Sequence, residues 1–112
     1  MKRLNIQVPA TEQDMKEELK MLRTNIQFCG ADKRVIVVTG CIAGEGKSTT
    51  ALNLAISLSQ LKKKVLLVDC DMRKSVLTTR LKASGVEYGL SHYLSGQASV
   101  EDITYSVNVP GL

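Results

Sequence analysis

The sequence predicts an α/β fold in which a parallel β-sheet is flanked by helices. Residues 34–39 and 65–68 are uninterrupted apolar runs without in–out alternation, as expected of parallel strands buried on both faces. A helical pattern over residues 46–61 lies between them, so that the three segments form a βαβ unit with a right-handed crossover. With 44% hydrophobic residues in 112, the chain is long enough for one small domain with an aliphatic core.

Composition argues against several classes of function. The net charge of +4 is small and scattered, so the chain is not expected to bind nucleic acid. The three cysteines form no CxxC pair and show no zinc spacing with His92, which favours a reduced, cytoplasmic protein. No apolar run approaches the ~18 residues of a membrane span, so any membrane association is expected to come through a partner.

A glycine-rich loop connects the first predicted strand to the predicted helix. Gly44 and Gly46 allow successive backbone N–H groups to point into one concavity, to which the helix adds unpaired N–H groups and its positive dipole end. Lys47 supplies a cation for phosphates, and Ser48 supplies a hydroxyl for Mg²⁺. Strand, loop, Lys-Ser and helix in this order predict a phosphate-binding P-loop, and the predicted fold class is therefore P-loop NTPase-like.

Two features of this loop leave alternatives open. The standard G-x-x-x-x-G-K-[ST] pattern has glycine where this chain has Cys41, and Gly40 comes one position early. Gly-Lys-Ser is also compatible with a plain helix start after a loop. The thiol of Cys41 is either buried and inert or a group whose oxidation blocks nucleotide binding.

Asp69 and Asp71 come directly after the second predicted strand. Ligands of open parallel sheets bind at the carboxyl ends of the strands, which places both acids beside the phosphate loop. Two carboxylates at the tip of an apolar strand require water, a cation or a metal ion. Next to a triphosphate, the two acids are expected to bind the metal or accept a proton, and the pattern does not decide which acid has which role.

The first 32 residues are expected to form an extended arm over residues 1–10 and then a helix. Thr11 is a candidate cap for this helix, which ends at Gly30 and Asp32. An apolar stripe at helical spacing supports it, formed by Met15, Leu19, Leu22 and Ile26. A charged stripe lies on another side, formed by Glu17, Lys20 and Arg23. The charged stripe is either a solvated face with weak internal pairs or a contact between subunits.

Beyond Arg73 the sequence predicts only short helices. They are expected over residues 75–81, over residues 90–94, and from Ser99 to about residue 105. His92 has no acidic or cysteine neighbour in sequence, which favours a surface or half-buried position over a catalytic role. The tyrosines are scattered, so packing is their expected role: Tyr88, Tyr93 and Tyr105.

Four segments carry motifs that occur together in one family. These are an LRTNxxF helix in residues 17–28, a variant Walker A loop without the first standard glycine in residues 44–49, a hydrophobic run followed by DxDxR in residues 66–73, and GLSxxLxG in residues 89–96. On these motifs the chain resembles the cytoplasmic catalytic domain of bacterial tyrosine kinases (BY-kinases), which control capsular and exopolysaccharide synthesis.

The resemblance implies transfer of the γ-phosphoryl group of ATP, with Mg²⁺, to protein tyrosines, chiefly on the kinase's own C-terminal tail. It also implies a homo-oligomeric ring and a cytoplasmic kinase held at the membrane by a transmembrane activator of the polysaccharide co-polymerase type. The residues that it assigns are, for catalysis, Lys47, Asp69 and Asp71; for nucleotide binding, Ala43, Gly44, Glu45, Gly46, Lys47, Ser48 and Thr49; for the metal, Ser48 and Asp71; and for ring assembly, Glu17, Lys20 and Arg23. Lys20 replaces an arginine of the family's E-x-x-R-x-x-R motif. A lysine ammonium lacks the planar guanidinium with which arginine makes bidentate contacts.

The chain departs from this family most in its length. The family continues with a third strand, a Walker B aspartate and a tyrosine-rich tail, which the 112 residues do not contain. The fold is therefore expected to be present only as an incomplete fragment. Residues 1–32 are expected to be the arm and oligomerisation helix, and residues 33–112 the N-terminal part of a P-loop kinase domain.

Two other functions compete with a kinase. Chromosome-partition and septum-site ATPases (ParA/MinD-like) are nucleotide-driven switches of the same fold, but their KGGxGK lysine is missing because Ile42 and Ala43 stand in that part of the loop. A truncated, non-catalytic regulator that binds nucleotide or the activator without turnover is compatible with the missing Walker B strand.

Overall fold

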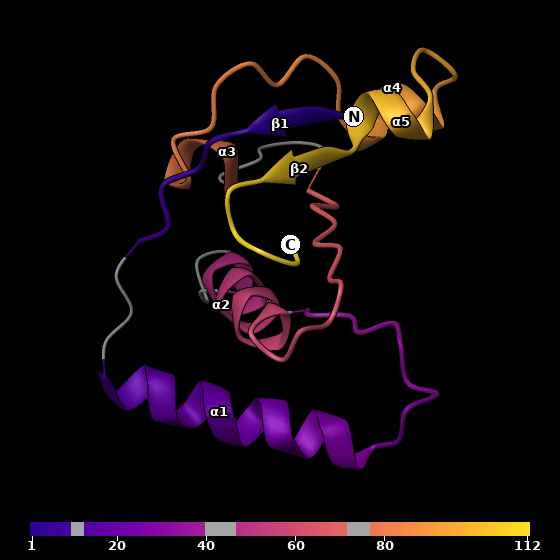
Figure 1. Ribbon diagram of the computed structural model, residues 1–112. Helices are drawn as coiled ribbons and strands as arrows, with labels where there is room; N and C mark the ends of the chain where they lie inside the picture. The colour runs from indigo at the N-terminus through magenta and orange to yellow at the C-terminus, as the bar shows by residue number, and fades with distance from the viewer. Residues whose placement is uncertain (10–12, 40–46, 72–76) are drawn as a thin grey trace. The chain divides into compact units, whose positions relative to one another are not determined.

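A computed structural model describes residues 1–9, 13–39, 47–71 and 77–112 of the chain (Figure 1). The elements in chain order are β1 (Lys2–Leu4), α1 (Gln13–Phe28), α2 (Lys47–Ser59), α3 (Leu77–Arg80), α4 (Leu90–Leu94), α5 (Val100–Ile103) and β2 (Tyr105–Val107). Within the described ranges, no helix is both long enough and apolar enough to cross a membrane.

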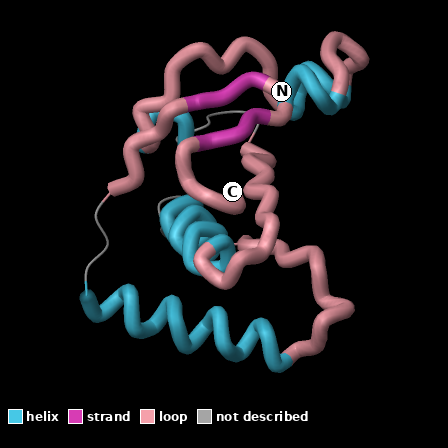
Figure 2. Tube along the Cα trace, in the orientation of Figure 1, coloured by secondary structure: helices cyan, strands magenta, loops and turns pink. Residues whose placement is uncertain are grey.

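These elements belong to two compact units. The first unit contains residues 1–9, 68–110 and 112, and the second contains residues 10–67 and 111. The sheet and the three short helices α3, α4 and α5 therefore lie in the first unit, whereas the two long helices α1 and α2 form the second (Figure 2). The predicted division between residues 32 and 33 stays a prediction.

The helix α1 confirms the helix predicted before Gly30. Its apolar residues recur at spacings of three and four, which gives the helix one face that can pack. At its end, the N–H groups of Cys29 and Gly30 donate to the carbonyls of Ile26 and Gln27 at 3.1 and 3.3 Å. These tightened turns satisfy carbonyls that the last turn of a helix leaves without partners.

The helix α2 carries the core of the second unit. Leu52 is only 1% exposed, and Leu54 and Ala55 are also buried. α1 contacts this helix, and Nη1 of Arg23 donates to the carbonyl oxygen of Ser57 across 3.1 Å. The helix predicted over residues 46–61 is therefore confirmed over its described part, with its end at Ser59.

The first unit contains a two-stranded parallel sheet of β1 and β2 (Figure 1). The register pairs Leu4 with Val107 at the end of the ladder. Asn108 then continues the pairing through its side chain. The N–H of Ile6 donates to Oδ1 of Asn108 at 2.8 Å, and Nδ2 of Asn108 donates to the carbonyl of Ile6 at 3.1 Å. The side-chain amide thus takes the place of a peptide group in a longer strand.

The structure corrects the predicted positions of the parallel strands. Residues 34–39 and 65–68 are loops rather than strands (Figure 2). Val35 is 88% exposed, Val37 is 81% exposed and Leu66 is 72% exposed, so neither run has the burial that its composition favours. A strand is stabilised by hydrogen-bonded neighbours and cross-strand packing, and neither run has a partner strand among the described residues. The predicted βαβ unit is therefore not formed by these runs.

Local capping explains why the starts of two of the short helices were predictable. The predicted end of the last helix near residue 105 is wrong, because α5 ends at Ile103 and Tyr105 begins β2. α4 has the predicted bounds, and Nδ1 of the half-buried His92 accepts a hydrogen bond from the N–H of Gly89 at 2.9 Å. Before α5, Ser99 and Asp102 form a capping box. Oγ of Ser99 accepts from the N–H of Asp102 at 3.2 Å, and Oδ2 of Asp102 accepts from the N–H of Ser99 at 2.9 Å. The described part of α3 also lies within its predicted segment.

Gly111 occupies a position in the second unit that only glycine fits. Its φ of +85° lies in the left-handed region, and its carbonyl accepts a hydrogen bond from the N–H of Val65 at 2.7 Å. A Cβ on this residue would lie 2.7 Å from the carbonyl oxygen of Lys63. Because that oxygen belongs to the backbone, it cannot rotate away as a side chain would.

We expect Gly111→Ala to lower the free energy of unfolding by about 2–4 kcal/mol, because overpacking adds to the strain of a left-handed alanine. Gly85→Ala is the matched control. Gly85 has a φ of +83°, but a Cβ there would meet nothing within 4 Å. Only the left-handed strain of about 1 kcal/mol remains in the control. Chemical denaturation followed by circular dichroism measures both losses, and equal losses would contradict the steric argument.

We also expect the capping box at Asp102 to depend on pH. Hydrogen bonds from the backbone and side chain of Ser99 hold the pKa of Asp102 below its ordinary value. The box therefore stabilises α5 above the unfolded-state pKa, and this contribution is lost as the pH falls through the folded-state pKa. The Ser99 amide donates to the Asp102 carboxylate, so its NMR protection factor should drop below about pH 4. Asp102→Asn should abolish this acid transition, and Glu101→Gln, outside the box, should preserve it.

Candidate functional site

The start of α2 carries the described part of the predicted phosphate site. Lys47 is the first residue of the helix and is exposed, whereas Ser48 and Thr49 are half-buried. A helix of 13 residues directs several N–H groups without intrahelical partners, and the positive end of its dipole, toward this end. The buried Leu52 anchors the helix one turn further along. This end of α2 is therefore suited to an anion such as a phosphate.

The remaining residues of the predicted loop are Ala43, Gly44, Glu45 and Gly46, and they lie outside the described residues, as does Cys41. Their assignment to nucleotide binding therefore stays a prediction. Among the cysteines within the described ranges, Cys29 and Cys70 are exposed free thiols.

Asp69 and Asp71 lie together in one turn of the first unit. The N–H of Asp71 donates to Oδ1 of Asp69 at 3.1 Å, which is the local hydrogen bond of an Asx-turn. Asp69 is half-buried and Asp71 is exposed. Lys47 belongs to the other compact unit, so the structure describes the cation and the two acids separately.

No group of three histidine, cysteine, aspartate or glutamate side chains in the described ranges could hold a metal ion. Mg²⁺ does not need such a group when it binds with a nucleotide, because phosphate oxygens and water supply most of its ligands. The hydroxyl of Ser48 and the carboxylate of Asp71 are oxygen donors of the kind that Mg²⁺ prefers. The chemistry of these residues therefore fits the ion.

The charged stripe on α1 divides into two kinds of contact. Nζ of Lys20 lies 3.9 Å from Oε1 of Glu17 in an exposed pair one turn apart. Arg23 is half-buried and donates to the carbonyl of Ser57 on α2. Arg23 therefore has a role within the chain that the sequence pattern did not reveal. The predicted oligomer contact of these residues stays a prediction.

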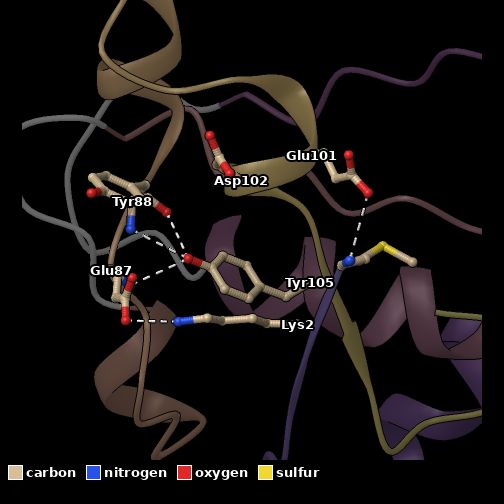
Figure 3. Close-up of a pocket in the computed structure, with 7 residues that line it drawn as sticks. Lys2, Glu87, Tyr88, Glu101, Asp102 and Tyr105 are labelled. Atoms are coloured by element: carbon tan, nitrogen blue, oxygen red, sulfur yellow. Dashed lines mark hydrogen bonds and ion pairs between the residues drawn. The ribbon is translucent and has the colours of Figure 1, made fainter.

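Tyr105 has a structural role that the sequence analysis missed. Its hydroxyl accepts hydrogen bonds from the N–H groups of Glu87 and Tyr88, both at 3.3 Å, and donates to the carbonyl of Tyr88 at 3.0 Å (Figure 3). The side chain thereby fastens the loop before α4 to the start of β2. No local signal could have identified this contact, because the partners are 17 and 18 residues apart in the sequence.

A hollow of about 220 Å³ lies beside the ring of Tyr105 (Figure 3). Its charged groups already have partners within the chain. Nζ of Lys2 lies 2.7 Å from Oε1 of Glu87, which raises the pKa of Lys2, and the α-ammonium of Met1 lies 3.8 Å from Oε1 of Glu101. Asp102, which also lines the hollow, belongs to the capping box. These groups hold the surrounding segments together rather than presenting an unpaired charge to a ligand.

Comparison with known proteins relates these residues to a family. A family model described as an AAA domain matches residues 33–111. The tyrosine-protein kinase CpsD of Streptococcus agalactiae is 47% identical over 96 residues, which cover 86% of this chain and 42% of that protein. The tyrosine-protein kinase YwqD of Bacillus subtilis (strain 168) is 38% identical over 94 residues, which cover 82% of this chain and 39% of that protein. The chain thus spans about two fifths of the length of these relatives. No solved structure matches it.

We expect Arg23→Ala to lower the free energy of unfolding of the second unit by about 1–2 kcal/mol, because it removes a charge-assisted hydrogen bond between α1 and α2. Lys20→Ala is the matched control on the same helix. Its exposed pair with Glu17 contributes only about 0.3 kcal/mol. Urea unfolding measures both effects. Equal losses in the two variants would show that the bond to Ser57 does not stabilise the unit.

Proposed function

We propose, from the premise that this chain belongs to the AAA domain family, that it binds ATP with Mg²⁺ and acts in phosphoryl transfer to protein tyrosines. One observation carries the proposal. The Lys-Ser pair at the start of α2 lies in a chain that matches relatives named tyrosine-protein kinase over 82–86% of its residues. The resemblance to bacterial tyrosine kinases, first found in the motifs, is confirmed by these relatives.

The start of α2 would hold the phosphates. The exposed ammonium of Lys47 is assigned to the β- and γ-phosphates, where it offsets their negative charge. The backbone N–H groups at the start of the helix are assigned to the same phosphates, together with residues 43–46 of the loop. Phosphoryl transfer requires mainly positioning and charge from the protein, and a cation at the end of an anchored helix supplies both.

The acids would serve the metal and the acceptor hydroxyl. Ser48 and Asp71 are proposed as Mg²⁺ ligands, and Mg²⁺ when bound neutralises charge on the transferred group. Asp69 and Asp71 are proposed to orient the tyrosine hydroxyl and accept its proton. The hydrogen bond between the Asp71 amide and Asp69 holds the two carboxylates in one turn, which supports a joint role.

The proposal extends to the protein in which this chain functions. By resemblance, that protein is an autokinase that regulates capsular or exopolysaccharide synthesis. It is proposed to assemble into a ring and to work in the cytoplasm beside a transmembrane activator of the co-polymerase type. On α1, Glu17 and Lys20 are exposed and available for a subunit contact, whereas Arg23 already bonds to Ser57.

We expect Lys47→Met to weaken ATP binding by about 10- to 100-fold, because a charge-assisted contact to phosphate contributes roughly 1.5–3 kcal/mol. Isothermal titration calorimetry with ATP and Mg²⁺ measures the affinity. Lys63→Met is the matched control, since Lys63 is an exposed lysine beyond the other end of α2. Unchanged affinity in Lys47→Met would refute the assignment of the phosphate site.

A second measurement separates the kinase from the two competing functions. The chain is incubated with γ-labelled ATP, Mg²⁺ and the cytoplasmic tail of the activator. Label on tyrosine supports the kinase, release of phosphate to water alone supports a nucleotide-driven switch, and ATP binding without turnover supports a non-catalytic regulator. Asp69→Asn and Asp71→Asn in the same assay assign the roles of the two acids.

A further inference from the structure

The first residues of the chain are bound to the first unit at several separate points. Beyond the ladder of β1 with β2, the backbone of Ile6 makes two hydrogen bonds to the side chain of Asn108. The N–H of Gln7 donates to the carbonyl of Leu81 at 2.8 Å. At the other end, Lys2 forms its ion pair with Glu87. The segment is thus attached along its whole length to residues far away in the sequence.

The same segment contributes to the buried hydrophobic residues of the first unit. Leu4 is 9% exposed, Ile6 is 6% exposed and Leu81 is 7% exposed, and these are the buried hydrophobic residues of that unit within the described ranges. Two of the three come from the first seven residues. Without them, only Leu81 of this set would remain. Residues 77–108 are therefore expected to depend on this segment for their fold.

The burial of the segment alternates along its length. Leu4 and Ile6 are buried, whereas Arg3, Asn5 and Gln7 are exposed. Side chains two apart point to the same face of an extended chain, so one face meets the unit and the other meets solvent. Lys2 extends the first face with a cation that pairs with Glu87. The complementary surface therefore selects an extended peptide with a cation followed by two apolar residues at alternate positions.

We propose that residues 1–7 form a detachable strap, and that the surface beneath it is a peptide-binding slot formed by β2, Asn108, Leu81 and Glu87. The slot binds an extended peptide with the pattern Lys-x-Leu-x-Ile, whose three named side chains lie on one face. The peptide backbone pairs in parallel with β2. Its occupant is the chain's own N-terminal segment. This segment lies outside the family match at residues 33–111, whereas every residue of the slot lies inside it.

The contacts that hold residues 1–7 are weak enough for this segment to detach locally. A three-residue, two-stranded ladder is marginal by itself, and the ion pair at Lys2 is exposed on both sides. Chain termini fray at lower free energy than the rest of a folded unit. Release of the strap would expose Leu81 and the paired edge of β2 together. The strap therefore controls whether residues 77–108 are folded.

Ile6→Asp in the full chain tests the strap, because it places a charge on the buried face. We expect amide exchange of residues 77–108, measured by mass spectrometry, to accelerate at least about tenfold, while α1 and α2 keep the exchange of the parent chain. Asn5→Asp adds the same charge to the exposed face and should leave both units unchanged. Equal acceleration in α2, or none in residues 77–108, would overturn the proposal.

A rescue experiment tests the slot directly. A synthetic peptide with the sequence of residues 1–8 is added at millimolar concentration to the Ile6→Asp chain. It should slow the exchange of residues 77–108 back toward that of the parent chain. The same peptide carrying Ile6→Asp is the control and should have no effect. Failure of the first peptide, or equal rescue by both, would refute a slot with this pattern.

Discussion

The first unit depends on the contact between the first residues of the chain and the last. Ile6 and Asn108 are 102 positions apart, and bringing such distant segments together costs conformational entropy that a ladder of three residue pairs offsets poorly. The two side-chain hydrogen bonds of Asn108 and the burial of Leu4 and Ile6 supply the additional stabilisation. The other elements of this unit are helices of four or five residues, which are too short to be stable alone. Tyr105 joins the loop before α4 to the same strand. Each of these elements therefore relies on the sheet.

The second unit is stabilised by helix packing rather than by a sheet. α2 is held by the burial of Leu52 and Ala55 and by the bond from Arg23, so its first residue is presented on a rigid element. This arrangement matters for the proposed chemistry, because a phosphate site works through fixed charges and fixed N–H groups. The usefulness of Lys47 comes from its position at the start of a long helix.

Features that depend on neighbours in the sequence could be predicted, whereas features that depend on distant residues could not. The capping box joins Ser99 and Asp102, which are three positions apart, and α4 begins at the predicted residue, because both depend on neighbours in sequence. The strands depend on distant partners. For this reason the strand predicted at the β-branched residues 34–39 was wrong, and β1 was expected only as an extended arm. The phosphate site could be proposed because its motif is local. The bond from Arg23 to Ser57 and the hydroxyl of Tyr105 could not be predicted, because each joins segments without a pattern that links them.

The exposed valines of residues 35–38 have a consequence for how this chain behaves in solution. A β-branched run without proline or acidic residues is a template onto which identical chains can add. Arg34 stands immediately before it and acts as a gatekeeper, since its charge opposes the stacking of copies in register, whereas the neighbouring Lys33 is paired with Asp32. Mobile ions screen that repulsion over distances of about 10 Å or less at moderate ionic strength. Solubility of the chain should therefore be governed by salt, and dilute buffer should preserve it better than concentrated buffer.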